Sequence, residues 1–600
     1  MDIYQYSPLS SDLHIRLFKL NLSPISHDDP LSLELVEAHL FDNGSFEALS
    51  YTWGDLNDSV AVNVGDHLLM ITPNLLSFLK RLREEERNKS QAAASMYWAD
   101  QICINQQDIP ERNRQVALMS SIYRESRTTL VWLGEAGDGV HAALELLRDV
   151  DLLGYGENDP RPLALPRVVQ VTEARLCNQG AGGNRTESEL LDLFNRAWFT
   201  RSWVIQEVAV AVACTVRVSE HLFRWESLDL AVIGLATIDK KRRGILSGSP
   251  MLKTAAAAAL RHIQYCRKRW TSRNAERHRH DFLYLLGRLS PTMACTDPRD
   301  RVYAYLSLQE EPRVLEADYT LSVDDVFIKT SATLAAASRR LDIFAYTTYP
   351  PIGSGKECSQ LPSWAIDWRM PNTMSRLRTK ADSSFCASGS YEYNPIPSGQ
   401  LCRILRVRGK VIDMVGATLT GHEFPRTGDS VTLMRCLTPA RIFEMTSHLC
   451  AVPGSPAEQT SLYHRAVKVL LRYDRKLDDA DGQWNENLES ALRITEAYQT
   501  NGQLSQGESS QLKEFTSKTN RKSVRTFYIT RQRKLLGLSP PLSRTGDLVC
   551  IVHGSRTPVI LRRSAAPGQF HVLGQSYLEG WMHGTHVTWR EDEADVFGLV

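Results

Sequence analysis

The stretch from Tyr97 to Gly134, YWADQICINQQDIPERNRQVALMSSIYRESRTTLVWLG, decides the fold class of this 600-residue chain. An aromatic and apolar run at 97–104 predicts a strand. Asp108 and Glu111 have the spacing of a capping box and predict the start of an amphipathic helix. The run at 128–134 predicts a second apolar strand. Strand, helix and strand in this order indicate a β-α-β unit, whose strands lie parallel in one sheet.

The residues before this stretch extend the same alternation. Phe46 to Trp53 predicts a further strand, and the runs at 60–64 and 68–71 predict a hairpin. Thr72 followed by Pro73 predicts a helix start. Strands that alternate with helices predict a doubly wound α/β domain with a parallel sheet, flavodoxin-like in class.

Composition and charge exclude several classes of protein. The chain is 42% hydrophobic and 23% charged, as expected for globular domains, and its net charge of +1 gives no general attraction to nucleic acid. No run of about 20 apolar residues predicts a membrane span, and no secretory signal is visible. The 11 cysteines are scattered without a CxxC pair, which predicts reduced thiols in a cytoplasmic protein and no metal site.

The pattern changes along the chain and predicts five regions. After a lead-in and the α/β domain, helical patterns dominate, then a polar, acid-rich insertion, then short β-like runs separated by Gly or Pro turns. The expected regions are a lead-in at 1–45, the α/β domain at 46–210, a mostly helical middle at 211–400, a variable region at 401–520 and a β-rich C-terminal module at 521–600.

Three motifs in the α/β domain resemble those of the fungal heterokaryon-incompatibility (HET) domain. They are FEALSYTWGD at Phe46–Asp55, the stretch quoted above, and RAWFTRSWVIQEV at Arg196–Val208, in the order of that family. The resemblance implies a role in fungal non-self recognition and programmed cell death. It also implies a protein partner or self-association, with signalling by assembly and without chemistry.

A candidate ligand site follows from the expected fold. Doubly wound sheets bind ligands at the carboxyl ends of their strands, where the Trp53-Gly54-Asp55 turn should lie. Tryptophans could stack on a base and an acid could hold ribose hydroxyls, so the site would suit a nucleotide. The candidate ligand-binding residues are Trp53, Gly54, Asp55, Asp100, Arg201 and Trp203.

The HET domain in turn resembles Toll/interleukin receptor (TIR) domains, some of which cleave NAD with a glutamate in a tryptophan-containing helix. SWVIQE at Ser202–Glu207 is similar to that pattern. The resemblance implies Glu207 as a catalytic carboxylate that stabilises an oxocarbenium-like state, with NAD as a substrate and no cofactor. An alternative is a structural Glu207 that pairs with Arg201 or Arg196.

The other candidates also have structural interpretations. A buried charge needs a partner, so Asp100, which the pattern places inside a strand, is expected to pair with Arg112 or Arg114. Asp55 could serve only to form a turn. The tryptophans on predicted strands are expected in the core: Trp98 and Trp132.

Overall fold

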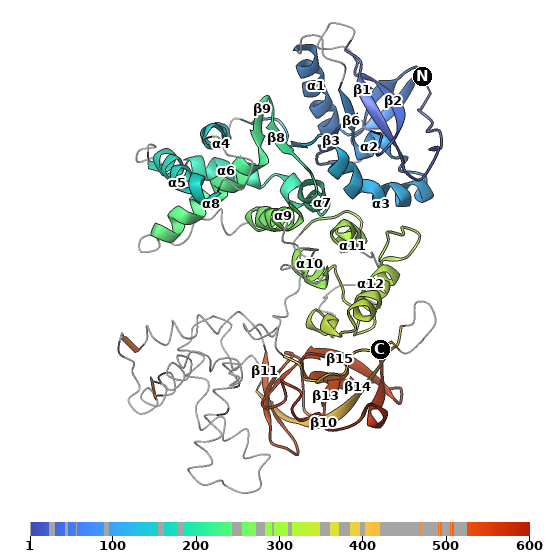
Figure 1. Cartoon of the computed structure of the whole chain (residues 1–600), viewed down its shortest axis with the longest axis vertical. Coiled ribbons are helices and arrows are strands. Elements are labelled where there is room, and N and C mark those ends of the chain that lie inside the picture. The colour runs from blue at the N-terminus through green and yellow to red at the C-terminus, as the bar shows by residue number, and fades with distance from the viewer. Residues whose placement is uncertain are drawn as a thin grey trace. The chain divides into compact units, whose positions relative to one another are not determined.

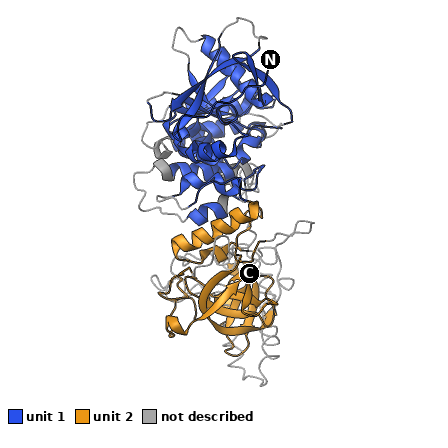
Figure 2. Cartoon of the chain, turned by 90° about the vertical axis from the view of Figure 1, so that its right-hand side faces the viewer, with its two compact units in different colours: residues 1–321 blue, residues 322–600 orange. Residues whose placement is uncertain are grey.

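The computed structural model separates the chain into two compact units, residues 1–321 and 322–600 (Figure 2). The division falls inside the region at 211–400 that was expected to be helical. The structure describes residues 2–22, 30–42, 46–55, 57–88, 95–137, 139–153, 161–177, 185–242, 255–271, 282–290, 293–309, 315–347, 361–370, 385–395, 403–419 and 525–600, together with 465, 469, 490, 493, 494, 505, 507 and 508.

Unit 1 is built on a nine-stranded mixed sheet (Figure 1). The strand order is β5-β4-β2-β1-β6-β3-β7-β8-β9. The first strands of the chain therefore lie inside the sheet, between β4 and β6. The strands are β1 (His14–Leu20), β2 (Ser32–His39), β3 (Phe46–Ser50), β4 (Val60–Val64), β5 (His67–Ile71), β6 (Met96–Trp98), β7 (Thr128–Trp132), β8 (Cys214–Val218) and β9 (His221–Arg224).

The centre of the sheet is parallel, as the sequence predicts. β3 pairs in parallel with β6 and with β7, and β7 pairs in parallel with β8. The prediction of a parallel sheet is wrong for the flanks, because β1 runs antiparallel to β6 and the outer strands form antiparallel pairs. Tight turns explain the pairs β4–β5 and β8–β9, because antiparallel neighbours need only a short connection, whereas β1 and β6 pair although they are far apart in the sequence.

Helices cover both faces of the parallel centre. Successive side chains of a strand point to opposite faces. On one face, Trp132 of β7 stacks on Phe78 of α1 (Pro73–Asn88), with 5.1 Å between ring centroids. On the other, the ring of Trp98 packs edge to face against Tyr123 of α3 (Ile109–Glu125). On the same face, the Ser50 hydroxyl donates to Glu207 of α7 (Val204–Ala209). Both strand tryptophans are fully buried, so their expected place in the core is confirmed.

Two local predictions in the opening stretch need correction. The strand ends at Trp98, and Asp100 begins the short helix α2 (Asp100–Cys103), where a carboxylate is favourable at the positive helix end. Asp108 does cap α3, since its side chain accepts from the Glu111 backbone N–H at 3.2 Å. The Glu111 carboxylate does not complete the capping box, because it binds Arg16 and the Asn105 backbone instead.

The rest of unit 1 is helical. A hairpin of β8 and β9 follows α7, and further helices follow the hairpin, of which α9 packs against α7. The remaining helical segments are α4 (His141–Leu152), α5 (Arg161–Cys177), α6 (Arg185–Phe194), η2 (Ala197–Thr200), α8 (Trp225–Arg242), α9 (Ala255–Thr271), α10 (Phe282–Leu289), α11 (Asp300–Tyr303) and η6 (Leu306–Leu308).

Unit 2 begins with helices and continues into an eight-stranded sheet. Strand β10 pairs with both β17 and β13, so β10, β13, β14, β15 and β17 form a closed ring. The elements are α12 (Val323–Ser338), η7 (Asp342–Ala345), β10 (Leu405–Leu419), β11 (Thr526–Thr530), β12 (Leu536–Ser539), β13 (Leu548–Val552), β14 (Val559–Arg563), β15 (Gln569–Gln575), β16 (Tyr577–Leu578), η9 (Glu591–Glu593) and β17 (Asp595–Leu599).

The C-terminal prediction holds in outline. The module expected at 521–600 contains the seven strands from β11 to β17. Most of the variable region expected at 401–520 lies outside the described residues, apart from β10 and isolated positions. None of the helices in the described ranges has the length and apolar character needed to cross a membrane.

Candidate functional site

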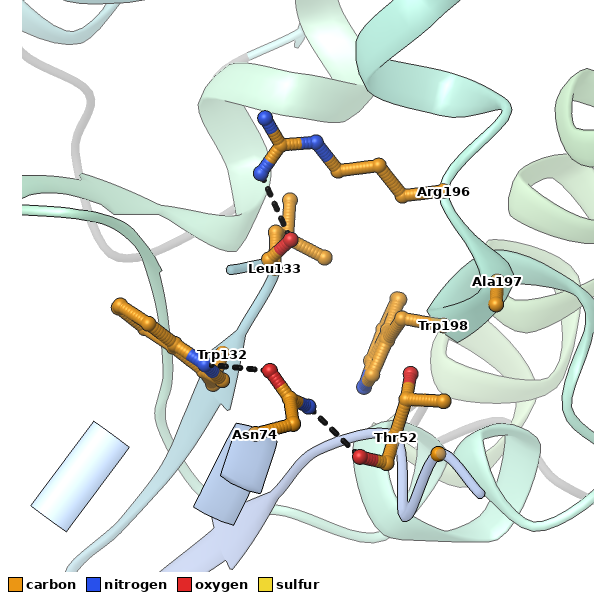
Figure 3. Close-up of a pocket in the computed structure, with 8 residues that line it drawn as sticks. Thr52, Asn74, Trp132, Leu133, Arg196, Ala197 and Trp198 are labelled. Carbon is orange, nitrogen blue, oxygen red and sulfur yellow. Dashed lines mark hydrogen bonds between the residues drawn. The ribbon is translucent and has the colours of Figure 1, made fainter. Parts of the chain in front are cut away.

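A pocket of about 190 Å³ lies at the carboxyl ends of β3 and β7 (Figure 3). These two strands mark a reversal of the strand order, because the chain runs from β3 to β6 on one side and returns to β7 on the other. Open α/β sheets bind ligands at such a point. The pocket is lined by Thr52, Gly54, Asn74, Trp132, Leu133, Arg196, Ala197 and Trp198.

Asn74 joins the three elements that meet at the pocket. It lies in the first turn of α1, and its amide nitrogen donates to the Thr52 carbonyl at 2.6 Å. Its amide oxygen accepts from the Trp132 indole at 3.0 Å. Figure 3 shows both bonds. One side chain thereby fixes the end of β7, the start of α1 and the segment after β3.

Arg196 supplies positive charge at the pocket. Its Nη1 donates to the Leu133 carbonyl at 2.7 Å and its Nη2 to the Glu135 carbonyl at 3.0 Å. Within the described ranges it forms no ion pair, since the Glu135 carboxylate binds Arg81 at 2.9 Å and Ser219 at 2.6 Å. Burial lowers the pKa of Arg196, with the nearby Glu135 charge opposing that shift.

Glu207 lies behind the pocket wall and is 2% exposed. The Trp198 indole donates to the Ser50 hydroxyl at 2.9 Å, and Ser50 donates to the Glu207 carboxyl group. Burial raises the pKa of Glu207 to about 7, although the Arg201 charge and the Ser50 bond both act to lower it. The carboxyl group therefore titrates near neutral pH inside the protein.

The suggested pairing of Glu207 with Arg201 or Arg196 is not a direct ion pair among the described residues, although the Arg201 charge acts on the Glu207 carboxyl group. Arg201 donates to the Tyr51 carbonyl, and Arg196 binds the two carbonyls described above. Neither arginine forms an ion pair with Glu207 in the part of the chain that the structure describes. The cause is that carbonyls at the strand ends accept both guanidinium groups.

The structure brings Trp53 and Asp100 together. Asp100 accepts from the Trp53 indole at 2.9 Å and from the Tyr51 hydroxyl at 2.8 Å. Its expected pairing with Arg112 or Arg114 is wrong, because two aromatic donors satisfy the carboxylate. Arg114 instead forms an ion pair with Asp12 at 3.4 Å. The guanidinium carbon of Arg112 lies 3.8 Å from the ring centre of Tyr319.

The remaining candidates lie in different settings. Gly54 lines the pocket in a conformation with φ of +81°, which favours glycine. Asp55 is exposed and accepts from Asn57 at 2.9 Å, as in a turn. Burial raises the pKa of Asp300 to about 6, Trp203 acts to lower it, and the Asp300 carboxylate accepts from the Tyr319 hydroxyl at 2.6 Å. Of the candidate ligand-binding residues, only Gly54 therefore lines the pocket.

Seven of the eight residues that line the pocket were outside the predicted site, and Trp132 among them was expected only in the core: Thr52, Asn74, Trp132, Leu133, Arg196, Ala197 and Trp198. Trp132 ends a strand that was predicted, and Thr72-Pro73 marks the helix start next to Asn74. The strand ends were therefore the available signal. Arg196 and Trp198 gave no such signal, because their partners at Leu133 and Ser50 are far away in the sequence.

Two family models match the chain. The model described as heterokaryon incompatibility protein (HET) matches residues 46–207, which include every residue that lines the pocket. The model described as Het-6 beta-barrel domain matches residues 448–600. The chain therefore holds one segment that is similar to HET domains and a second that is similar to Het-6 barrel domains.

The likeness to a curated protein covers both domains. The chain is 26% identical over 663 residues to heterokaryon incompatibility protein 6, OR allele, of Neurospora crassa. The alignment spans 95% of this chain and 94% of that relative. No solved structure matches the chain.

Proposed function

We propose that the protein acts in fungal non-self recognition as a protein of the heterokaryon-incompatibility type. The observation that carries this proposal is the full-length likeness to the Neurospora crassa protein, with a HET domain and a Het-6 barrel domain in one chain. A likeness confined to one domain would suggest a shared module, whereas this one extends over nearly all of both chains.

The proposal includes signalling through a protein partner or self-association, with cell death as its outcome. It also includes a flavodoxin- or TIR-like origin for the parallel centre of unit 1. The order of its strands, β6-β3-β7-β8, supports that origin, because it is second, first, third and fourth along the chain. Flavodoxin-like sheets have the same order.

Growth of a filamentous fungus tests the proposed function. Induced expression of the full chain, and of residues 1–321 alone, is expected to slow growth or kill cells, because the HET domain lies in that unit. A shorter fragment ending at 220 would lack Arg267 and Ala294, which contact the chain at α7 and just before it. The Arg267 side chain donates to the Val208 carbonyl at 2.9 Å, and the Ser202 backbone N–H donates to the Ala294 carbonyl.

Residues 322–600 expressed to the same level are the matched control, and growth should be normal. Normal growth with the full chain and with residues 1–321, at verified protein levels in several hosts, would contradict the proposal. Killing by residues 322–600 alone would instead assign the toxic activity to the C-terminal unit.

A further inference from the structure

The aromatic wall of the pocket at the ends of β3 and β7 is already packed within the protein. The ring of Trp132 stacks on Phe78, with 5.1 Å between ring centroids. The ring of Trp198 lies 6.0 Å from that of Trp225. Both indole N–H groups donate to other side chains, and both tryptophans of the wall are 1% exposed. A ligand of this pocket must therefore be recognised by its polar groups.

Arg196 is a cation at the pocket that no carboxylate neutralises in the part of the chain that the structure describes. Its side chain is half-buried and donates to the Leu133 and Glu135 carbonyls, at 2.7 and 3.0 Å. A guanidinium group has five N–H donors, and these two bonds use one donor each. The bonds also hold the planar group in place, so an oxyanion would meet a fixed fork of the remaining donors.

Thr52 offers a second donor on a different side of the pocket from Arg196 (Figure 3). Its backbone carbonyl accepts from Asn74, but its hydroxyl group has no hydrogen-bond partner among the described residues. A hydroxyl group can donate one hydrogen bond and so can bind an oxygen of an anion. The pocket thus holds a cation and a neutral donor, both with capacity for one ligand.

The volume and the placement of the donors select the kind of anion. The pocket measures about 190 Å³, whereas pockets that enclose drug-sized molecules measure about 300–1,000 Å³. One water molecule occupies about 30 Å³ of the liquid, so a group of a few heavy atoms fits together with some water. A carboxylate is planar, but a phosphate group has oxygens on all sides and can accept from donors that lie apart. It also carries about −1.5 to −2 charge near pH 7.

We propose that this pocket binds a single phosphate group, either as the free ion or at the end of a small phosphate ester. The guanidinium fork of Arg196 pairs with phosphate oxygens on one side, and the Thr52 hydroxyl donates from another. The pocket lies at the reversal of strand order between β3 and β7, where open α/β sheets bind ligands. This site goes beyond the proposed role in non-self recognition and does not depend on it.

Calorimetric titration of the full chain at constant ionic strength tests the site with inorganic phosphate, glycerol phosphate and acetate. Phosphate is expected to bind about tenfold or more tightly than acetate, because it carries more charge and has an oxygen for each donor. Arg196→Gln should weaken phosphate binding about tenfold or more, and Thr52→Val about fivefold. Arg114→Gln, at an exposed arginine paired with Asp12, should leave it unchanged.

A matched pair of variants keeps Arg196 and changes only the charge beside it. Ala197 lines the pocket and is exposed. Ala197→Asp should weaken phosphate binding about tenfold, because a like charge repels the anion. Ala197→Asn, which has a similar shape without the charge, should change the binding by less than about threefold. This pair decides the question even where Arg196→Gln fails to fold, which urea unfolding of each variant reveals.

The two phosphate ligands distinguish the source of the group. Tighter binding of glycerol phosphate supports the proposal with an ester as the ligand, and tighter binding of inorganic phosphate supports it with the free ion. Absence of binding by both, or acetate binding as tightly as phosphate, would overturn the proposal. Equal phosphate binding by Ala197→Asp and Ala197→Asn, or unchanged binding by a folded Arg196→Gln, would also overturn it.

Discussion

Glu207→Gln is expected to abolish the fall in the free energy of unfolding that the unchanged protein shows as the pH rises from about 4.5 to about 7. Burial raises the pKa of Glu207 in the folded protein from its ordinary 4.5 to about 7, so the folded state holds a proton that the unfolded state releases. Stability from this group is complete below pH 4.5 and is lost as the pH rises through 7. At about 1.4 kcal/mol per pH unit, the loss approaches about 3 kcal/mol.

Urea unfolding at several pH values between 4.5 and 8 measures this effect. The difference in free energy of unfolding between the two proteins should change by about 3 kcal/mol over that range. Asp300, whose pKa burial also raises, contributes equally to both proteins and cancels in the difference. A difference that stays constant with pH would show that Glu207 does not carry its proton in the folded state.

The same two proteins address the hypothesis of NAD cleavage. If Glu207 stabilises an oxocarbenium-like state, nicotinamide release should fall by roughly two or more orders of magnitude in Glu207→Gln, as for loss of a preorganised electrostatic group. Release that is absent from both proteins, or equal in both, would remove Glu207 from any such chemistry. Unfolding data on the same preparation separate this result from a loss of folded protein.

Arg16→Met is expected to destabilise unit 1 by about 3–5 kcal/mol, because it leaves a buried carboxylate without its partner. Arg16 of β1 donates to both oxygens of Glu111 on α3, at 2.7 and 2.9 Å. The two residues are 5% and 3% exposed. Arg16 also donates to the Cys103 carbonyl at 3.0 Å, so the substitution affects the end of α2 as well.

A double-mutant cycle measures the pair. Combining Arg16→Met with Glu111→Leu should recover part of the loss, since the two buried charges are then removed together. Asp12→Ala breaks the exposed pair with Arg114 and should change the free energy of unfolding by at most about 1 kcal/mol. Equal small effects at both sites would show that Arg16 and Glu111 are hydrated in the folded protein.

Local patterns predicted the centre of the sheet well. The apolar runs that became β3, β6 and β7 have no polar face, as expected for parallel strands covered on both sides. The Asp108 cap and the hairpin of β4 and β5 also depend on neighbours in the sequence, and both were predicted. Each of these features is determined by residues a few positions apart.

The failures share one physical cause, which is pairing over long separations. Asp100 is satisfied by Tyr51 and Trp53, and Arg196 by the carbonyls after β7, and no local pattern records either set of partners. Gly54 was predicted at the carboxyl edge because a turn must follow β3. The positions of Arg196 and Asn74 at the pocket depend on tertiary packing, so the sequence alone did not identify them.

The position of β3 in the middle of the sheet affects how the chain can fold as it leaves the ribosome. β1 and β2 can pair early, since they are close in the sequence. β3 cannot pair with β6 and β7 until both have been synthesised. In the same way, β7 cannot pair with β8, which begins at Cys214, until that part of the chain has been made. Because distant parallel pairings form slowly and leave edges open, the first half of unit 1 should need protection from aggregation during synthesis.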